Sequence, residues 1–296
     1  MSFVSYSFAV FFGVVVALRL LLAGRRAHAA YTAMLLVASF LFYASTVPWH
    51  LLLLLGSSGV DVWAGRRIAA APVGSRARRW LLALPLAVNL SLLAFFKYYL
   101  WVLAWLAQHV FDSPAVALAL LPSWVLTLPL GISFFTFEAM SYAIDVYRGR
   151  IAPVRRLRDY WLFIGFFPHL VSGPIVRASE FLYQIERTRK PRVSVLTTGA
   201  YLMIRGFFLK MVVADNLSPI VERLWTPAAV PGANATVALL APVLFAVQIL
   251  CDFDGYTSIA RGAAYVLGFR LPDNFEHPYI ARSFQDFWNR WHITLS

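Results

Sequence analysis

The chain has 296 residues, of which 60% are hydrophobic and 14% charged, and its mean hydropathy is +0.68. Ordinary globular domains carry about 45–50% apolar and about 25% charged residues, so this composition excludes most soluble architectures and a disordered chain. The 26 Lys and Arg residues outnumber the 14 Asp and Glu residues. Because they cluster between apolar runs, they indicate cytoplasmic loops of a membrane protein, and we expect no nucleic-acid partner. The single cysteine, Cys251, excludes an internal disulfide and a multi-cysteine metal site, and we predict no metal.

The first apolar run, residues 3–22, has no basic residue before it, while Arg19, Arg25 and Arg26 lie at its far end. No small-residue cleavage site follows it cleanly, so we interpret the run as a membrane anchor rather than a cleaved signal peptide. The arginines place this end in the cytoplasm and the N-terminus outside. We therefore predict a multi-pass protein of the cell (inner) membrane, with the lipid bilayer as its first partner.

Two shorter apolar runs follow at residues 31–46 and 49–62, and arginines between residues 66 and 79 come next. A hairpin that returns to the cytoplasmic side fits this order. The apolar stretch at residues 80–110 is either one long tilted helix or two shorter segments, and the sequence leaves both open. Asp112, Ser113 and Pro114 predict an outside turn.

A further crossing is predicted at residues 124–147, with a basic loop after it. The next apolar piece, residues 160–176, is interrupted by Pro168, Gly173 and Pro174 and has basic clusters on both sides. We interpret it as a re-entrant hairpin rather than a span. Irregular backbone at membrane depth persists only where protein buries it or water lines it, so the hairpin is expected to border a cavity.

The last long apolar runs are residues 196–216 and 235–251, joined by a loop with Pro, Gly and Asn at residues 227–234. Beyond residue 251 the chain turns polar, then gives a short apolar run at 260–269 and an aromatic, charged tail near the cytoplasmic surface. The predicted fold class is all-α, a polytopic transmembrane helical bundle in a single membrane domain over residues 1–296.

Ionisable residues inside membrane segments are costly, so each is a candidate for a site. The acidic candidates include Glu138, Asp252 and Asp254. They either line a substrate path or form buried structural pairs, of which Lys210 with Asp215 is an example. The full set is Glu138, Asp145, Asp252 and Asp254, with Lys97, Arg205 and Lys210, and Glu138, Tyr142 and Asp145 share one helical face.

Two histidines have distinctive neighbours. His169 lies between two prolines in the proposed hairpin and is either a hydrogen-bonded core residue or a cavity-lining one. His292 follows Asn289 and Arg290 in the aromatic, cationic run FWNRWH. This run is typical of an aromatic belt at the membrane interface. Alternatively, the imidazole of His292 acts as a general base or acid near neutral pH.

Phosphate-loop, zinc-helix and nucleophile-elbow motifs are missing from the sequence. Three ordered blocks resemble the membrane-bound O-acyltransferases, in the bacterial branch of alginate O-acetylation and teichoic-acid D-alanylation. The blocks are LPLGISFFTFE from residue 128, continuing to the glycine at 149; FPHLVSGPIVR from residue 167; and residues 248–296, with CDFDGY at 251 and FWNRWHITLS at 287.

The resemblance implies a helical bundle with a central funnel or tunnel. It implies transfer of an acyl group, acetyl first among the candidates, from a cytoplasmic thioester to a hydroxyl of an exported polysaccharide or an intermediary protein. The donor would be acetyl-CoA or an acyl carrier protein's pantetheine, with no bound cofactor, and a periplasmic acyltransferase would be a partner. We take His292 as the candidate catalytic residue, and the candidate tunnel-lining residues are Glu138, His169, Asp252, Asp254, Asn289 and Arg290.

Two departures from the family pattern matter. Asp254 stands where relatives have Ser, and Ser258 takes a later Asp place. No Trp-His-Gly, the segment of the family's principal histidine, occurs here, and His292 matches only the first, more accessory family histidine. We therefore expect the N-terminal part of the family core, C-terminally truncated. The alternative is a non-catalytic homologue acting as a membrane transporter or scaffold in a polysaccharide export complex.

Overall fold

The computed structural model describes residues 1–22, 28–109, 127–171, 173–186, 192–225 and 235–295. Within these ranges the chain forms helices and no β-strand, and its β pairing is a single antiparallel bridge between Phe275 and Trp291. This confirms the all-α prediction. The expected turn at residues 112–114 and the loop at 227–234 lie outside the described residues.

Three helical stretches in the described part of the chain are long and apolar enough to cross a membrane: Arg76–Tyr99, Val193–Trp225 and Ala235–Val266. The shorter helices Tyr6–Leu21 and His28–Ala44 are also apolar. Several apolar helices of this kind confirm a polytopic membrane protein, because a helix needs about 20 apolar residues to span the bilayer. The tunnel and the re-entrant hairpin stay predictions.

The chain divides into two compact units, described separately below. The first comprises Met1–Met34, Ser172–Val176 and Glu186–Ser296, and the second comprises Leu35–Val171 and Arg177–Ile185. The single membrane domain over residues 1–296 therefore stays a prediction.

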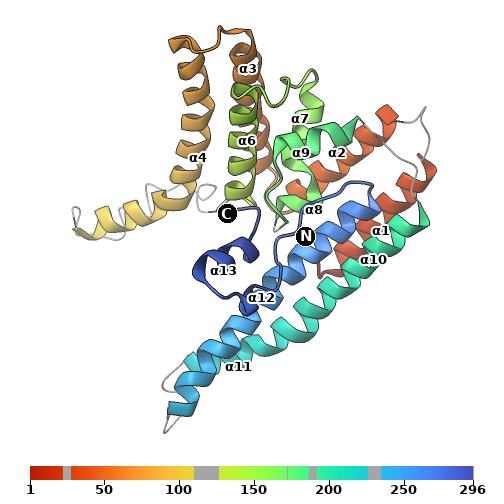
Figure 1. Ribbon diagram of the computed structural model, residues 1–296, viewed down its shortest axis with the longest axis vertical. Coiled ribbons are helices and arrows are strands. Elements are labelled where there is room, and N and C mark those ends of the chain that lie inside the picture. The colour runs from red at the N-terminus through yellow and green to blue at the C-terminus, as the bar shows by residue number, and fades with distance from the viewer. Residues whose placement is uncertain (23–27, 110–126, 172, 187–191, 226–234, 296) are drawn as a thin grey trace. The chain divides into compact units, whose positions relative to one another are not determined.

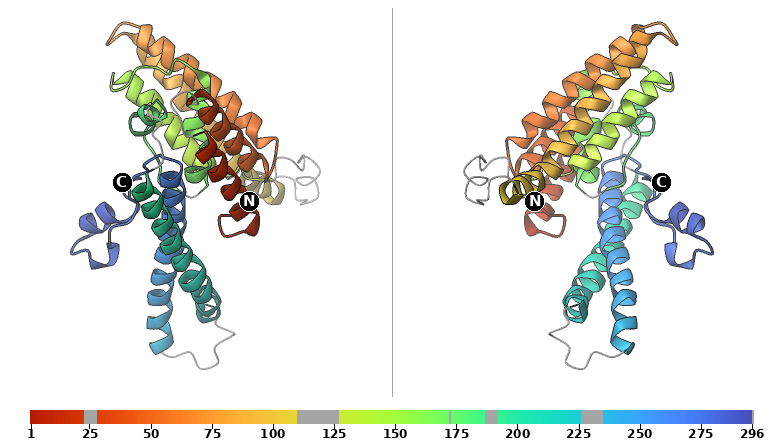
Figure 2. Two further views of the ribbon diagram at one scale, coloured as in Figure 1. Left: turned by 90° about the vertical axis from the view of Figure 1, so that its right-hand side faces the viewer. Right: turned by 90° about the vertical axis from the view of Figure 1, so that its left-hand side faces the viewer.

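In the second unit, helices α3 (His50–Ala70), α4 (Arg76–His109) and α6 (Ile132–Tyr147) lie side by side (Figures 1 and 2). Of the two alternatives for residues 80–110, the structure has one continuous helix through His109, with Pro85 inside it. Close approach of α3 and α6 depends on Gly65, because a Cβ there would lie 2.7 Å from the Tyr142 hydroxyl oxygen.

The apolar piece at residues 160–176 is broken, as the prolines predict. Helix α7 (Leu157–Gly165) ends just before the short helix α8 (Phe167–Leu170), and α9 (Ala178–Ile185) follows. Pro168 lies in the first turn of α8, where a missing N–H leaves no hydrogen bond unmade. The break thus has a local cause in the sequence.

In the first unit, α1 (Tyr6–Leu21) is followed much later by α10 (Val193–Phe207), a π-helical turn η3 (Phe208–Ala214) and α11 (Asp215–Trp225). The long helix α12 (Ala235–Val266) then leads through the short η5 (Pro278–Ile280) to α13 (Phe284–Arg290). The sequence predicted that the run from 235 would end at Cys251. Instead α12 continues unbroken, because its polar side chains find partners on α10 and η3.

Glycines set the crossing of α10 and α12. A Cβ on Gly206 would lie 2.6 Å from the Gly255 carbonyl oxygen, and a Cβ on Gly262 would lie 2.6 Å from that of Gly199. Small residues at both contacts let the two backbones approach closely, as in membrane helix pairs generally. The antiparallel register that pairs 206 with 255 also pairs 199 with 262.

The C-terminal end of α12 is capped from the N-terminal region. Arg19 is buried and donates a hydrogen bond to the Val266 carbonyl, and the Tyr31 hydroxyl donates one to the Leu267 carbonyl at 2.5 Å. A cation suits the negative end of a helix dipole. Arg19 therefore caps a helix and is not a loop cation, which leaves Arg25 and Arg26, outside the described residues, to carry the predicted orientation.

Candidate functional site

His292 lies in a buried aromatic environment in the first unit. The side chain is only slightly exposed. Its ring centroid is 4.9 Å from that of Phe253 on α12, at an angle of 68°, and 6.4 Å from that of Phe275. The edge contact with Phe253 and the tilted contact with Phe275 hold the imidazole plane, the first of them against the middle of a membrane-length helix.

Backbone pairing holds His292 in place. The adjacent Trp291 forms the antiparallel bridge with Phe275, and the Ile293 amide donates to the Asn274 carbonyl at 3.0 Å. His292 itself has a φ of +46°. This left-handed conformation is uncommon for a residue with a side chain, and such conformations concentrate at functional sites.

The electrostatic state of His292 suits proton acceptance. Burial lowers the pKa of its imidazole below the ordinary value of 6.5. Its Nδ1 atom is buried and makes no hydrogen bond to another described residue. The ring is therefore neutral at neutral pH, the form that can take a proton from a hydroxyl group.

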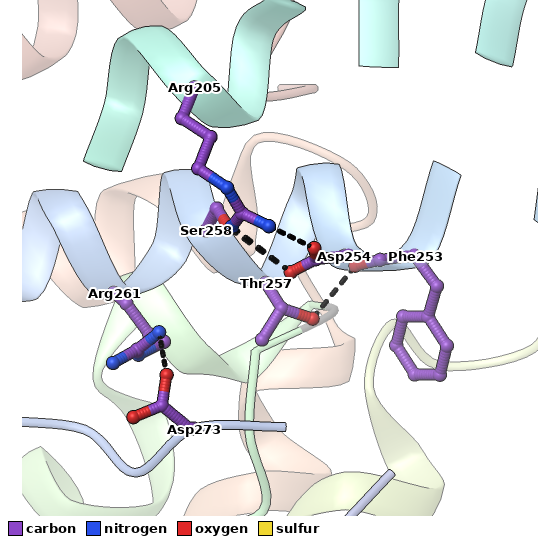
Figure 3. Close-up of polar contacts among 7 residues, drawn as sticks. All are labelled: Arg205, Phe253, Asp254, Thr257, Ser258, Arg261 and Asp273. Carbon is purple, nitrogen blue, oxygen red and sulfur yellow. Dashed lines mark hydrogen bonds and ion pairs between the residues drawn. The ribbon is translucent and has the colours of Figure 1, made fainter. Parts of the chain in front are cut away.

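Asp254 is engaged by a cation on the facing helix. Its Oδ2 atom lies 2.5 Å from Nη2 of Arg205 on α10, and Arg205 Nη1 donates to the Ser258 hydroxyl at 2.6 Å. Figure 3 shows these contacts, with Phe253 pointing to the other side of α12. The Asp254 side chain is 15% exposed. A charge-assisted network of this kind allows an acidic residue inside a largely apolar helix.

Asp252 pairs with a different cation, Lys210. Lys210 Nζ, on the π-helical turn, lies 2.5 Å from Asp252 Oδ1 and 2.7 Å from Asp215 Oδ1. The pair of Lys210 with Asp215 that the sequence suggested is therefore formed, but the Asp215 side chain is 47% exposed, so the pair is not fully buried. Both carboxylates on α12 thus stabilise the α10–η3–α12 assembly.

Removing one partner of the Arg205–Asp254 pair is predicted to destabilise the protein more than removing both. Asp254→Asn leaves a guanidinium without its carboxylate, and we expect about 1–3 kcal/mol lower stability. The double variant Asp254→Asn with Arg205→Gln should recover most of this loss. Unfolding of the four proteins of this double-mutant cycle in mixed micelles measures the coupling. Additive effects would contradict the pairing.

In the second unit, His169 and Glu138 form a buried contact. Both side chains are almost fully buried, and His169 Nε2 lies 3.5 Å from Glu138 Oε2. The imidazole packs edge-on against Phe166 and Phe181, with ring centroids 5.6 and 5.4 Å away. This geometry favours the structural interpretation of the pair, and a tunnel-lining role for either residue stays a prediction.

Glu138, Tyr142 and Asp145, which the spacing placed on one face of α6, are turned toward the core. All three are buried. Asp145 lies 3.5 Å from Nη1 of Arg150 in the following turn. The shared face therefore serves packing and a local ion pair.

The two remaining candidates lie at the end of α13. Arg290 Nε donates to Asp286 Oδ1 at 2.7 Å, and this hydrogen bond lowers the pKa of the Asp286 carboxyl. The Glu276 carbonyl accepts from Arg290 Nη1 at 3.4 Å. Asn289 is exposed. Arg290 thus braces the loop that leads into His292, while its role toward a substrate stays a prediction.

One buried polar network was not identified from the sequence. Asp61 on α3 accepts from Asn89 Nδ2 at 2.7 Å and from the Tyr160 hydroxyl at 3.0 Å, and all three side chains are buried. The sequence signal that could have indicated it is an acid, Asp61, inside the apolar run at 49–62 and an amide, Asn89, inside the next apolar run. The network ties α3, α4 and α7 together.

His292 is buried on left-handed backbone and packs against α12, a helix of membrane-spanning length that carries the paired acids Asp252 and Asp254. The chain is therefore a membrane protein with a candidate polar site on α12. Residues 156–296 match the family described as MBOAT, membrane-bound O-acyltransferase family. The matched segment contains both His169 and His292.

The chain is similar to several curated proteins. It is 37% identical over 267 residues to "Probable alginate O-acetylase AlgI" of Pseudomonas aeruginosa, covering 89% of this chain and 49% of the relative. It is 32% identical over 288 residues to the peptidoglycan O-acetyltransferase of Helicobacter pylori, with 88% and 53% covered. It is 31% identical over 169 residues to the teichoic acid D-alanyltransferase of Bacillus subtilis, with 56% and 42% covered. The chain thus spans about half the length of the curated relatives it matches.

Proposed function

We propose that this protein transfers an acetyl group from a cytoplasmic thioester to a hydroxyl group of an exported polysaccharide or of an intermediary protein. The observation that carries the proposal is the similarity to an alginate O-acetylase along 89% of the chain. The donor is acetyl-CoA or the pantetheine thioester of an acyl carrier protein, and a periplasmic acyltransferase completes delivery where an intermediary protein receives the group. Buried His292, in the matched family segment, supports the chemistry.

The proposed reaction needs little beyond positioning and a proton acceptor. The hydroxyl oxygen attacks the thioester carbonyl carbon, the carbon–sulfur bond breaks, and an oxygen ester and a thiol result. His292 takes the hydroxyl proton as the carbon–oxygen bond forms and returns it to the departing thiolate. Because a thiolate is a good leaving group, placing the hydroxyl beside the carbonyl supplies much of the rate.

In this proposal the protein lies in the inner membrane with its N-terminus outside. Residues 160–176 form a re-entrant hairpin that borders a tunnel, and Glu138, His169, Asp252, Asp254, Asn289 and Arg290 lie along it. The arginine clusters between apolar runs support this orientation. The Arg205–Asp254 and Lys210–Asp252 pairs would hold α10 and η3 against α12 beside the reaction path.

The pH dependence of transfer tests the role of His292. Burial lowers the pKa of its imidazole, so the neutral base persists below pH 6.5 and is lost only at more acidic pH. We expect kcat to stay constant from pH 8 to pH 6.5 and to fall at lower pH. Initial rates with a labelled acetyl thioester measure this profile. A rate that already halves above pH 6.5 would contradict the neutral, buried histidine.

Deleting the gene in the host tests the function as a whole. We expect the O-acetyl content of the exported polysaccharide, measured by mass spectrometry after mild hydrolysis, to fall in the deletion strain from the parent-strain level to background. Restoring the gene should restore the ester. An unchanged ester content, with altered export of unmodified polysaccharide, would favour a transporter or scaffold instead.

A further inference from the structure

A groove opens on the second unit, at the C-terminal end of α3. Its volume is about 280 Å³. Most of its wall is one face of α3, since residues spaced three, four and seven apart share a helical face, and the rest comes from the first residue of α7. The lining residues are Gly59, Val62, Trp63, Arg66, Arg67 and Leu157.

One end of the groove is apolar. Gly59 leaves its floor open, because a Cβ at this position would meet nothing within 4 Å. Val62 is buried beside it, and the Trp63 indole is 47% exposed. A flat aromatic surface next to an open helix face offers a place for a hydrocarbon chain to lie along α3.

The other end is cationic. Arg66 and Arg67 are exposed, and in the described part of the chain no carboxylate lies within 4.0 Å of either guanidinium. Arg66 Nη2 donates to the Arg155 carbonyl at 3.0 Å, and Arg67 lies 5.9 Å from the Trp63 ring centroid. These contacts orient both groups and leave most of their N–H donors available.

The groove is held in shape by the segment before α7. The Val154 amide donates to the Tyr142 hydroxyl at 3.2 Å, and Gly65 leaves the room that the Tyr142 ring needs against α3. The hydrogen bond from Arg66 to Arg155 holds the same segment at a second point. Leu157, directly after it, is therefore fixed as the opposite wall.

We propose that this groove binds an anionic phospholipid of the cytoplasmic leaflet. The lipid phosphate would lie between Arg66 and Arg67, since guanidinium forks match phosphate geometry. Its glycerol and upper acyl chain would follow α3 toward Gly59, about 10 Å away at 1.5 Å per residue. Free phosphate would leave the apolar end empty. Basic clusters at residues 66–79 and 148–158 support a cytoplasmic position, where anionic lipids concentrate.

Lipid titration of the purified protein tests the proposal. With native mass spectrometry we expect phosphatidylglycerol to bind more tightly than phosphatidylcholine of the same chain length. Removing both charges with Arg66→Gln and Arg67→Gln should weaken phosphatidylglycerol binding about 25-fold, at about fivefold per arginine. Gly59→Phe fills the floor of the groove without changing its charge. It should weaken phosphatidylglycerol binding at least tenfold, which is about the effect of losing one apolar contact.

The matched control is Arg76→Gln with Arg79→Gln, which removes the same charge from exposed positions outside the groove. It should leave binding within about twofold, since general surface attraction contributes little at a distance. Three results would overturn the proposal. The control pair could weaken binding as much as the groove arginines, or at least one of the two groove changes, Gly59→Phe and the arginine pair, could leave binding unchanged. Micromolar coenzyme A could also displace the lipid. The last would assign the groove to a soluble phosphate ester.

Discussion

His292→Asn is expected to lower acetyl transfer by about 100- to 10,000-fold, the usual contribution of a general base. Asparagine tolerates the left-handed conformation that His292 adopts at a φ of +46°, so the backbone should be kept while the imidazole is lost. The expected change is in kcat, with little change in KM for the thioester. Single-turnover transfer of label from an acetyl thioester measures it.

His277→Asn is the matched control. His277 also has a left-handed backbone, with a φ of +47°, but its side chain is exposed before η5. The same substitution there should leave the rate within about twofold, because surface changes away from a site have small effects. Equal loss in both variants would mean that the loop, not the imidazole, carries the effect. Full activity of His292→Asn would contradict its proposed role.

Gly131→Ala is expected to produce the second large effect, on stability. Gly131 precedes α6 with a φ of +68°, and a Cβ there would lie only 2.1 Å from the Leu170 carbonyl oxygen. Alanine would suffer the left-handed backbone penalty of about 1–2 kcal/mol and would also displace α8. We expect at least about 2 kcal/mol of further loss, as in overpacked cores.

Gly149→Ala separates the two causes. Gly149 has nearly the same φ, +70°, but a Cβ there would meet nothing within 4 Å. Its alanine variant should therefore show the backbone penalty alone. Unfolding free energies in mixed micelles of both variants give the difference. Equal losses would mean that the approach of α6 to α8, the helix carrying His169, is not tight.

The sequence predicted the helical fold and the break at residues 160–176 because those features have local causes. Apolar runs of bilayer length form helices, because a helix satisfies its backbone hydrogen bonds internally where no water is present. Pro168 interrupts the pattern at the point where α8 begins. A shared face for Glu138, Tyr142 and Asp145 followed from helical spacing alone, and all three are buried.

The continuity of α12 was missed because the polar stretch after Cys251 reads locally as the end of an apolar run. Its acids pair with Arg205 and Lys210, which lie 49 and 42 residues earlier in the chain. A usable signal was present in the glycines. The pairing of Gly206 with Gly255 and of the two glycines seven residues away fixes an antiparallel register. That register places Arg205 beside Asp254 and Lys210 beside Asp252.

The environment of His292 could not be predicted from its neighbours. The run FWNRWH is equally typical of an aromatic belt at the membrane interface. Its aromatic residues do not indicate which way the imidazole of His292 points. Burial of His292 depends on Phe253, from the middle of α12, and on Phe275. These contacts arise only after the chain has turned back, so spacing within the run cannot reveal them.

The central claim is tested most directly with sealed membrane vesicles from the host that expose the cytoplasmic face. Acetyl-CoA, or an acetylated carrier protein, labelled in the acetyl carbonyl is supplied outside. Labelled oxygen ester on acceptor inside the vesicle is then measured for the wild-type protein and for His292→Asn. The account predicts labelled ester with the wild type and at least a 100-fold lower rate with the variant, from the contribution of a general base. Thioester hydrolysis without any labelled ester inside would contradict it.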